Sequence, residues 1–341
     1  MSTFLIGAML AGCAGTNGTR VQFVYIAPGG NTAYQIVENT VVDEQLNMIK
    51  AKKIGKPWSY MGHALFGNTY YDGQKMYSSI GPNLYIYDSI TAKTTIHKGY
   101  SSYAMKKING DMWIATQSGK TTRLCKIDEK QTVECQYEVE NHQITDFYFN
   151  FDENTLFATG TGSGVETGDM MDQYKVVKYD LMTGVETILK HGGEHILGAR
   201  LANICPGQFI TSNGNIYTTD GEKIGAIIGT SGQQLSGLVN DQIAGTAAFM
   251  DYDNNLFEVY SCENNTPVLQ RVIELSHEPD TFPESYSRES ADNGEISMRI
   301  RSNEDFSETI GIQSVNLRSG KVEVYYFDEP VTNIHAVARF L

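Results

Sequence analysis

Five polar residues recur at similar places along the chain, and their side chains could perform acid–base or metal chemistry. They are His63, Tyr103, Asp146, Arg200 and His335. Histidine, aspartate and tyrosine can ligate metals or transfer protons near neutral pH. Each falls near the start of the first strand of a predicted repeat, and Arg200 is displaced from the common position by one residue. Thr246 takes the same place in a further repeat.

A circular arrangement of the repeats would bring these side chains to one mouth of a central channel, where an enzyme site could form. Such positions also lie near solvent, so polar side chains there can simply hydrate the channel or bond to backbone groups. We favour this second interpretation, because an error of one residue in the alignment reverses the direction of a strand side chain.

The familiar sequence signatures of catalysis are missing. The chain has no His-Glu-x-x-His motif, no Gly-x-Ser-x-Gly nucleophile elbow and no lysine-containing phosphate loop. Residues 160–164 are rich in glycine but lack the spacing of a phosphate loop, and we interpret them as flexible. Residues 251–255 lack the glycine of a calcium loop and are interpreted as an ordinary turn. The sequence therefore identifies no metal site and leaves any cofactor unknown.

The charge of the chain excludes one class of partner. The 341 residues include 40 acidic and 26 basic side chains, which gives a formal net charge of −14. No basic run is longer than a pair such as Lys52-Lys53. A phosphate backbone would be repelled, so nucleic acid is not an expected partner.

The N-terminal segment points to export. Residues 4–10 form an apolar run that is too short to span a bilayer but suits the core of a signal peptide, and it ends in Leu10-Ala11-Gly12-Cys13. That tetrapeptide resembles the lipobox of bacterial lipoproteins, although no Lys or Arg precedes the run. The resemblance implies that Cys13 carries a lipid and that residues 1–19 are signal and tether. It further implies a periplasmic or outer-membrane protein that meets the membrane only through this anchor.

Four cysteines remain after Cys13, and an exported protein permits disulfides among them. Cys125 and Cys135 flank a short turn, so a hairpin would place them opposite each other on paired strands. The alternative is that all four are buried free thiols, because cysteine is also a common small core residue.

Internal repetition is the strongest signal in the sequence. Six segments place a turn shortly before an apolar strand, at intervals of about 36 to 53 residues, which is the range of β-propeller blades. The turns begin at Asp72, Asn109, Asp152, Pro206, Asp253 and Asp292. A second turn follows in most units, at residues 87–93, 179–184, 219–223 and 316–321. Two hairpins per unit make a four-stranded sheet, so the pattern predicts an all-β fold.

The second turns are similar to the outer hairpins of the YVTN-type, quinoprotein-like and WD-repeat propeller families, which often read Tyr-Asp-x-x-Thr-Gly-Lys. This resemblance extends from about Val21 to the C-terminus and implies architecture, not activity. Six blades are expected at residues 58–99, 100–141, 142–193, 194–238, 239–279 and 280–329. A seventh would combine strands of residues 21–48 with residues 331–341, so that the C-terminal strand pairs with the N-terminal strands and closes the ring. We therefore predict a seven-bladed β-propeller that forms a single domain over residues 20–341.

Two function classes fit these features. The first is a non-catalytic cell-envelope propeller that binds a protein or glycan partner through its loop face, with inserts at residues 159–172 and 278–289. The second is an enzyme at the channel mouth, such as a lyase, lactonase or hydrolase that acts on an acidic sugar or lactone. We favour the binding protein, because no catalytic motif is present.

Overall fold

A computed structural model describes most of the chain as β-strands joined by tight turns. The described residues are 22–30, 33–42, 47–59, 69–80, 82–91, 93–100, 102–118, 121–140, 142–151, 153–162, 174–251, 253–276, 281–284, 290–304, 308–332 and 336–340. Cys13, His63 and His335 lie outside them, as do residues 163–172 of the first insert and residues 278–280 and 285–289 of the second. Within the described part of the chain, no helix is long and apolar enough to cross a membrane.

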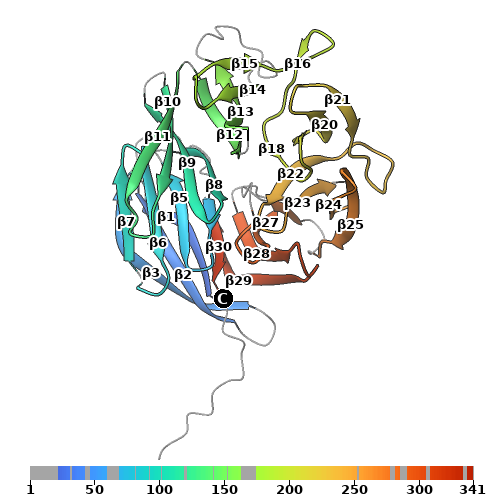
Figure 1. Ribbon diagram of the computed structural model, residues 1–341. Coiled ribbons are helices and arrows are strands. Elements are labelled where there is room, and N and C mark those ends of the chain that lie inside the picture. Colours follow the sequence, from blue (N-terminus) through green and yellow to red (C-terminus); the bar gives the residue numbers. More distant parts are fainter. Residues whose placement is uncertain are drawn as a thin grey trace, which may run out of the picture.

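Five sheets have four antiparallel strands each and follow one another along the chain (Figure 1). Blade 1 contains β4 (Thr69–Tyr71), β5 (Lys75–Ile80), β6 (Asn83–Asp88) and β7 (Lys93–Lys98). Blade 2 contains β8 (Ser102–Ile108), β9 (Asp111–Ser118), β10 (Thr121–Ile127) and β11 (Val133–Glu140). Blade 3 contains β12 (His142–Asn150), β13 (Thr155–Gly162), β14 (Lys175–Asp180) and β15 (Glu186–Ile188). Blade 4 contains β18 (Leu201–Ala202), β19 (Gln208–Thr211), β20 (Asn215–Thr218) and β21 (Lys223–Ala226). Blade 5 contains β22 (Ser236–Asp241), β23 (Thr246–Asp251), β24 (Leu256–Glu263) and β25 (Thr266–Glu274).

The remaining large sheet has eight strands in the order β26-β27-β28-β29-β3-β2-β1-β30. Its first half is blade 6, which contains β26 (Thr281–Glu284), β27 (Glu295–Ser302), β28 (Glu308–Asn316) and β29 (Val322–Thr332). Its second half contains β3 (Asn47–Ser59), β2 (Ala33–Val42), β1 (Gln22–Gly30) and β30 (Ala336–Phe340). A separate short hairpin joins β16 (Lys190–His191) to β17 (Glu194–His195), between blades 3 and 4.

The prediction of seven blades is wrong, because the part of the chain that the structure describes forms six. The strands that were expected to make a seventh blade are hydrogen-bonded into the sheet of blade 6. The junction is a short parallel pairing in which Tyr326 and Phe327 of β29 lie opposite Asn47 and Met48 of β3. Because this pairing links β29 to β3, the strands β3, β2, β1 and β30 belong to the same hydrogen-bonded sheet as blade 6 and do not form a separate sheet. Within that sheet β30 pairs with β1 in antiparallel register from Gln22 to Ile26.

The first strands of successive blades lie side by side around the centre of the ring. β4 contacts β8, β8 contacts β12, β12 contacts β18, and β18 contacts β22. β30 contacts both β4 and β27. Because a short connection joins the first strand to the second in blades 1 to 5, these connections gather at one end of the channel.

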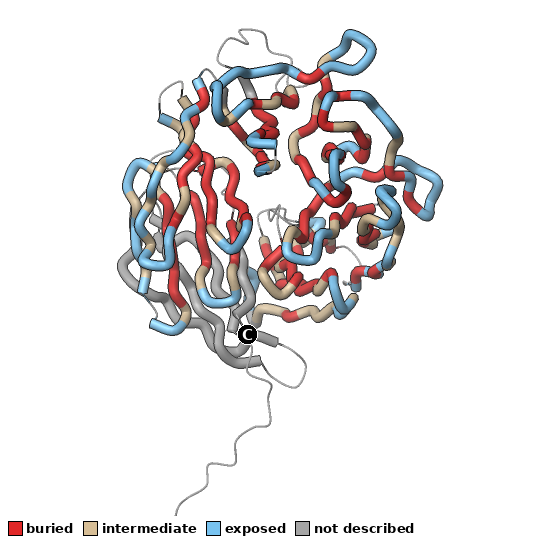
Figure 2. The backbone as a smooth tube through the Cα atoms, in the orientation of Figure 1, coloured by how far each residue is buried: buried red, intermediate tan, exposed pale blue. Residues whose placement is uncertain are grey.

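The hydrophobic core is divided into clusters that lie between neighbouring blades. One cluster packs Trp113 of blade 2 against Phe147 and Phe149 of blade 3, and another packs Phe249 of blade 5 against Ile210 of blade 4. Figure 2 shows buried residues running along the strands and exposed residues at the outer turns. Burial of aromatic and branched side chains between sheets is the main force that holds such layers together.

The β8–β9 turn illustrates how the sequence dictates the local structure. Asn109 and Gly110 both have positive φ angles, 52° and 86°. A two-residue hairpin turn of this hand matches the twist of the strands, and asparagine and glycine adopt it at the lowest cost. The Asn-Gly pair therefore fixes where blade 2 turns back at the channel mouth.

Candidate functional site

Among the three described candidates for the channel site, Tyr103, Asp146 and Arg200, Asp146 is the most deeply buried. Its carboxylate lies 3.0 Å from the ammonium group of Lys106, and the two side chains are only 2% and 1% exposed. Its oxygens also accept the backbone N–H groups of Phe147, at 2.9 Å, and Leu201, at 2.6 Å. The Lys106 ammonium group donates to the Leu201 carbonyl at 3.2 Å. This ion pair therefore joins the first strands of blades 2, 3 and 4.

Arg200 connects the next pair of blades. Its guanidinium Nη1 donates to the Leu238 carbonyl of β22 at 2.7 Å. Tyr103 lies in β8 and is partly exposed. Thr246 begins β23, which is the second strand of blade 5, so it does not occupy the first-strand position assigned to it. The convergence of Asp146 with His63 and His335 stays a prediction, since both histidines lie outside the described residues.

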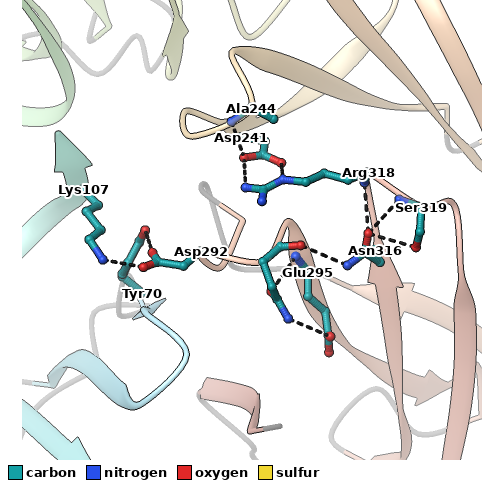
Figure 3. A network of polar contacts seen from close by, with 10 residues as sticks. Tyr70, Lys107, Asp241, Ala244, Asp292, Glu295, Asn316, Arg318 and Ser319 are labelled. Atoms are coloured by element: carbon teal, nitrogen blue, oxygen red, sulfur yellow. Dashed lines mark hydrogen bonds and ion pairs between the residues drawn. The ribbon is translucent and has the colours of Figure 1, made fainter. Parts of the chain in front are cut away.

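Polar and charged side chains from four blades meet near the channel mouth (Figure 3). Asp292, in the turn before β27, accepts the Tyr70 hydroxyl at 2.8 Å and pairs with Lys107 at the end of β8. Asp241, at the end of β22, accepts two hydrogen bonds of 2.8 Å from the guanidinium group of Arg318. These bonds raise the pKa of Arg318 and keep it charged. Both acids are thus neutralised by partners and hold blades 1, 2, 5 and 6 together.

A cavity of about 580 Å³ lies among the first turns of blades 2 to 5, and we call it the amide cavity. Five of the residues that line it carry a side-chain carboxamide: Asn109, Asn150, Asn203, Asn240 and Gln242. The rest of its described lining is Tyr148, Phe149, Phe151, Glu153, Ile204, Pro206 and Gly207. The volume falls within the range of about 300 to 1,000 Å³ that small-molecule sites occupy.

Two residues that line the amide cavity each have a polar atom without a hydrogen-bond partner in the described structure. These atoms are the Tyr148 hydroxyl and Oε1 of Gln242, and both are buried. Burial raises the pKa of Tyr148, and the Asn203 side chain beside the hydroxyl partly offsets that rise. The contact with Asn203 falls short of hydrogen-bond geometry. Buried polar groups in native proteins are nearly always paired, so these two atoms are groups that a bound ligand or a water molecule could satisfy.

A disulfide supports one wall of this cavity. Cys205 is bonded to Cys262 of β24, with Cα atoms 5.2 Å apart. Cys205 lies between Ile204 and Pro206, which both line the cavity, so the bond ties the wall in blade 4 to blade 5. A second disulfide joins Cys125 to Cys135 across β10 and β11, the pair indicated by the hairpin spacing.

The amide cavity was not found from sequence, although a signal for it was present. Three of the turns that defined the repeats contribute to its lining, through Asn109, Glu153 and Gly207. They were interpreted as hairpin markers because their residue types suit tight turns. Among the described residues, no three His, Cys, Asp or Glu side chains gather in a way that could hold a metal ion.

A ring of four-stranded antiparallel blades places this chain among the β-propellers. No protein-family model matches the chain, and no match to a curated protein is found. Solved propeller structures resemble it in fold. A candidate 6-phosphogluconolactonase from Bacteroides uniformis is 12% identical, with a TM-score of 0.48 over 94% of this chain and 99% of the other.

Two further structures show the same range of resemblance. TolB from Acinetobacter baumannii is 10% identical, with a TM-score of 0.42 over 94% of this chain and 66% of TolB. The WD40 repeats of RRP9 are 9% identical, with a TM-score of 0.46 over 84% of this chain and 89% of the other. At these identities the likeness concerns the fold alone.

Proposed function

We propose that this protein is a non-catalytic propeller of the cell envelope that binds a protein or glycan partner at the mouth of its channel. The observation that carries the proposal is the amide cavity, because it combines a ligand-sized volume with side chains suited to recognition. Its amides can donate and accept hydrogen bonds, and Phe151 exposes 39% of its surface beside them. Propellers commonly recognise partners through the loops at one face.

The charged residues near the mouth support binding over catalysis. Asp241, Asp292 and Asp146 each have a close cationic partner. A general acid or base must reach the substrate within hydrogen-bond distance, and acids committed to ion pairs in this way are poorly placed to do so. Their arrangement instead stiffens the turns that surround the cavity.

The test compares a variant that blocks the cavity with one that does not. Phe151→Arg places a long charged side chain at the mouth, whereas Ile90→Arg makes the same change at an exposed outer turn of blade 1. Both variants and the wild type are applied to a glycan array and to immobilised envelope proteins. We expect Phe151→Arg alone to lose binding. Turnover of an acidic sugar or lactone by the wild type would instead establish the alternative, an enzyme at the channel mouth.

The envelope location rests on Cys13 and is tested separately. Cells that express the wild type or Cys13→Ser are grown with labelled palmitate and then fractionated. A lipid-anchored protein incorporates the label only when Cys13 is present, and it is released from membranes only by detergent. Equal labelling of the two proteins, or release of the wild type in soluble form, would refute the anchor.

A further inference from the structure

We infer that the amide cavity binds an uncharged sugar unit of a glycan. This inference rests on the proposed function and makes it more specific, because it commits to one of the two partner classes and to the charge of the ligand. It follows from three features of the described lining: its hydrogen-bonding groups, its charge and its aromatic surface.

The hydrogen-bonding groups favour a ligand that both donates and accepts. Oε1 of Gln242 needs a donor, whereas the Tyr148 hydroxyl can donate or accept. Each carboxamide presents one acceptor and two donors. A sugar hydroxyl also donates and accepts, so several hydroxyls on one ring could bond to lining residues that come from different blades. A carboxylate group offers only acceptors, so it could not itself satisfy Oε1 of Gln242.

The charge of the lining disfavours acidic ligands. Among the described lining residues, Glu153 is the one ionisable at neutral pH, and none is Lys or Arg. Glu153 also helps to raise the pKa of Tyr148, which places its charge close to the unpaired hydroxyl. A carboxylate or phosphate that enters the cavity would therefore meet a like charge with no cation in the described lining to offset it. An uncharged ligand avoids that repulsion.

The aromatic residues supply an apolar face for the ring of a sugar. The Phe149 and Phe151 rings are stacked, with centroids 5.0 Å apart, and Phe149 packs on Trp113 at 4.8 Å. This stack holds Phe151 in place at the edge of the cavity while leaving part of it exposed. A rigid, partly exposed ring beside planar amides suits a ligand that has apolar C–H groups on its faces and hydroxyls around its edge.

The experiment measures binding of neutral and acidic sugars to the folded protein by titration calorimetry and by saturation-transfer NMR. The neutral probes are glucose, galactose, mannose, N-acetylglucosamine, cellobiose and lactose, and the acidic probes are glucuronate and galacturonate. We expect at least one neutral probe to bind more tightly than either uronate. Glu153→Gln should then strengthen uronate binding while changing neutral-sugar binding by less than about twofold, because it removes only the repulsion.

Three variants locate the site. Tyr148→Phe removes only the unpaired hydroxyl and should weaken neutral-sugar binding about tenfold, the loss expected for one or two hydrogen bonds. Phe151→Ala should have a similar effect through lost stacking. Tyr179→Phe is the matched control, because Tyr179 is as buried as Tyr148, at 5% exposed, but its hydroxyl donates to Glu186 and does not line the cavity. Thermal melting verifies that each variant is folded.

The outcomes separate this inference from the proposed function. Neutral-sugar binding that is unchanged by Tyr148→Phe and Phe151→Ala would overturn the inference, as would tighter binding of uronates by the wild type. Absence of binding to every sugar would overturn it too, while a protein partner that requires Phe151 would still satisfy the proposed function. Cleavage of a bound neutral sugar would refute the non-catalytic proposal but leave the neutral-sugar site standing.

Discussion

Replacement of Asp146 by asparagine tests whether the buried ion pair is a structural joint of the ring. The substitution keeps the size of the side chain and one acceptor for the Leu201 N–H group, but it leaves the Lys106 charge in a site that is 1% exposed. Removal of one partner from a buried pair typically costs about 3 to 5 kcal/mol.

The expected change in melting temperature follows from the size of the chain. An unfolding entropy of about 2.1 cal/mol/K per residue gives about 0.7 kcal/mol/K for 341 residues unfolding as one unit. Asp146→Asn should therefore lower Tm by about 4 to 7 °C. Lys106→Met should cost less, since the Asp146 carboxylate keeps two backbone N–H donors.

Differential scanning calorimetry at pH 7 measures this effect, with Lys321→Met as the matched control. Lys321 pairs with Glu323 at 2.9 Å, but its side chain is 64% exposed, and exposed pairs contribute about 0 to 1 kcal/mol. The control should melt within about 1.5 °C of the wild type. The double variant Lys106→Met/Asp146→Asn should melt above Asp146→Asn alone, because the uncompensated charge is gone. If Asp146→Asn melts together with the control, the reasoning is refuted.

Three further predictions concern stability. Hydrogen bonding from Asn254 is the main cause that lowers the pKa of Asp251, so the stability that this carboxylate contributes is present above its unfolded pKa of about 3.9 and is lost as pH falls through its lower folded pKa. Asp251→Asn should therefore make the free energy of unfolding, measured with urea, depend less on pH between pH 5 and pH 2. An unchanged pH dependence would contradict this. The Cys205–Cys262 bond spans 57 residues, so the double variant Cys205→Ser/Cys262→Ser should lower the free energy of unfolding by about 4 kcal/mol. The Cys125–Cys135 bond spans 10 residues, and its removal in Cys125→Ser/Cys135→Ser should cost about 3 kcal/mol. Denaturant titration should show this order, and the reverse order would refute the loop-entropy argument. Deletion of residues 331–341 removes β30 and the last two residues of β29, and it exposes the edge of β1, so it should lower Tm clearly in calorimetry. A truncated protein that melts like the full chain would show that this pairing is dispensable.

The sequence by itself determined the features that depend on short stretches of chain. The Asn109-Gly110 turn has positive φ angles at both residues, which asparagine and glycine adopt at low cost, so this pair indicates a hairpin from the local sequence alone. The repeated pairs of turns placed blades 1 to 6 close to their observed strands, and the spacing of Cys125 and Cys135 placed them on facing strands of one hairpin. Such features are local because a turn and its two strands contain all the contacts that define them.

Tertiary structure decided the features that depend on contacts between distant segments. The parallel pairing of β3 with β29 joins residues about 280 positions apart, and it made one eight-stranded sheet where a separate seventh blade was expected. Lys106 was not linked to Asp146 by any local pattern, and the amide cavity combines turns from four blades. Sequence periodicity predicts which residues face a neighbouring blade. It does not predict which side chains contact each other between two blades, because those contacts depend on how whole sheets are placed relative to one another.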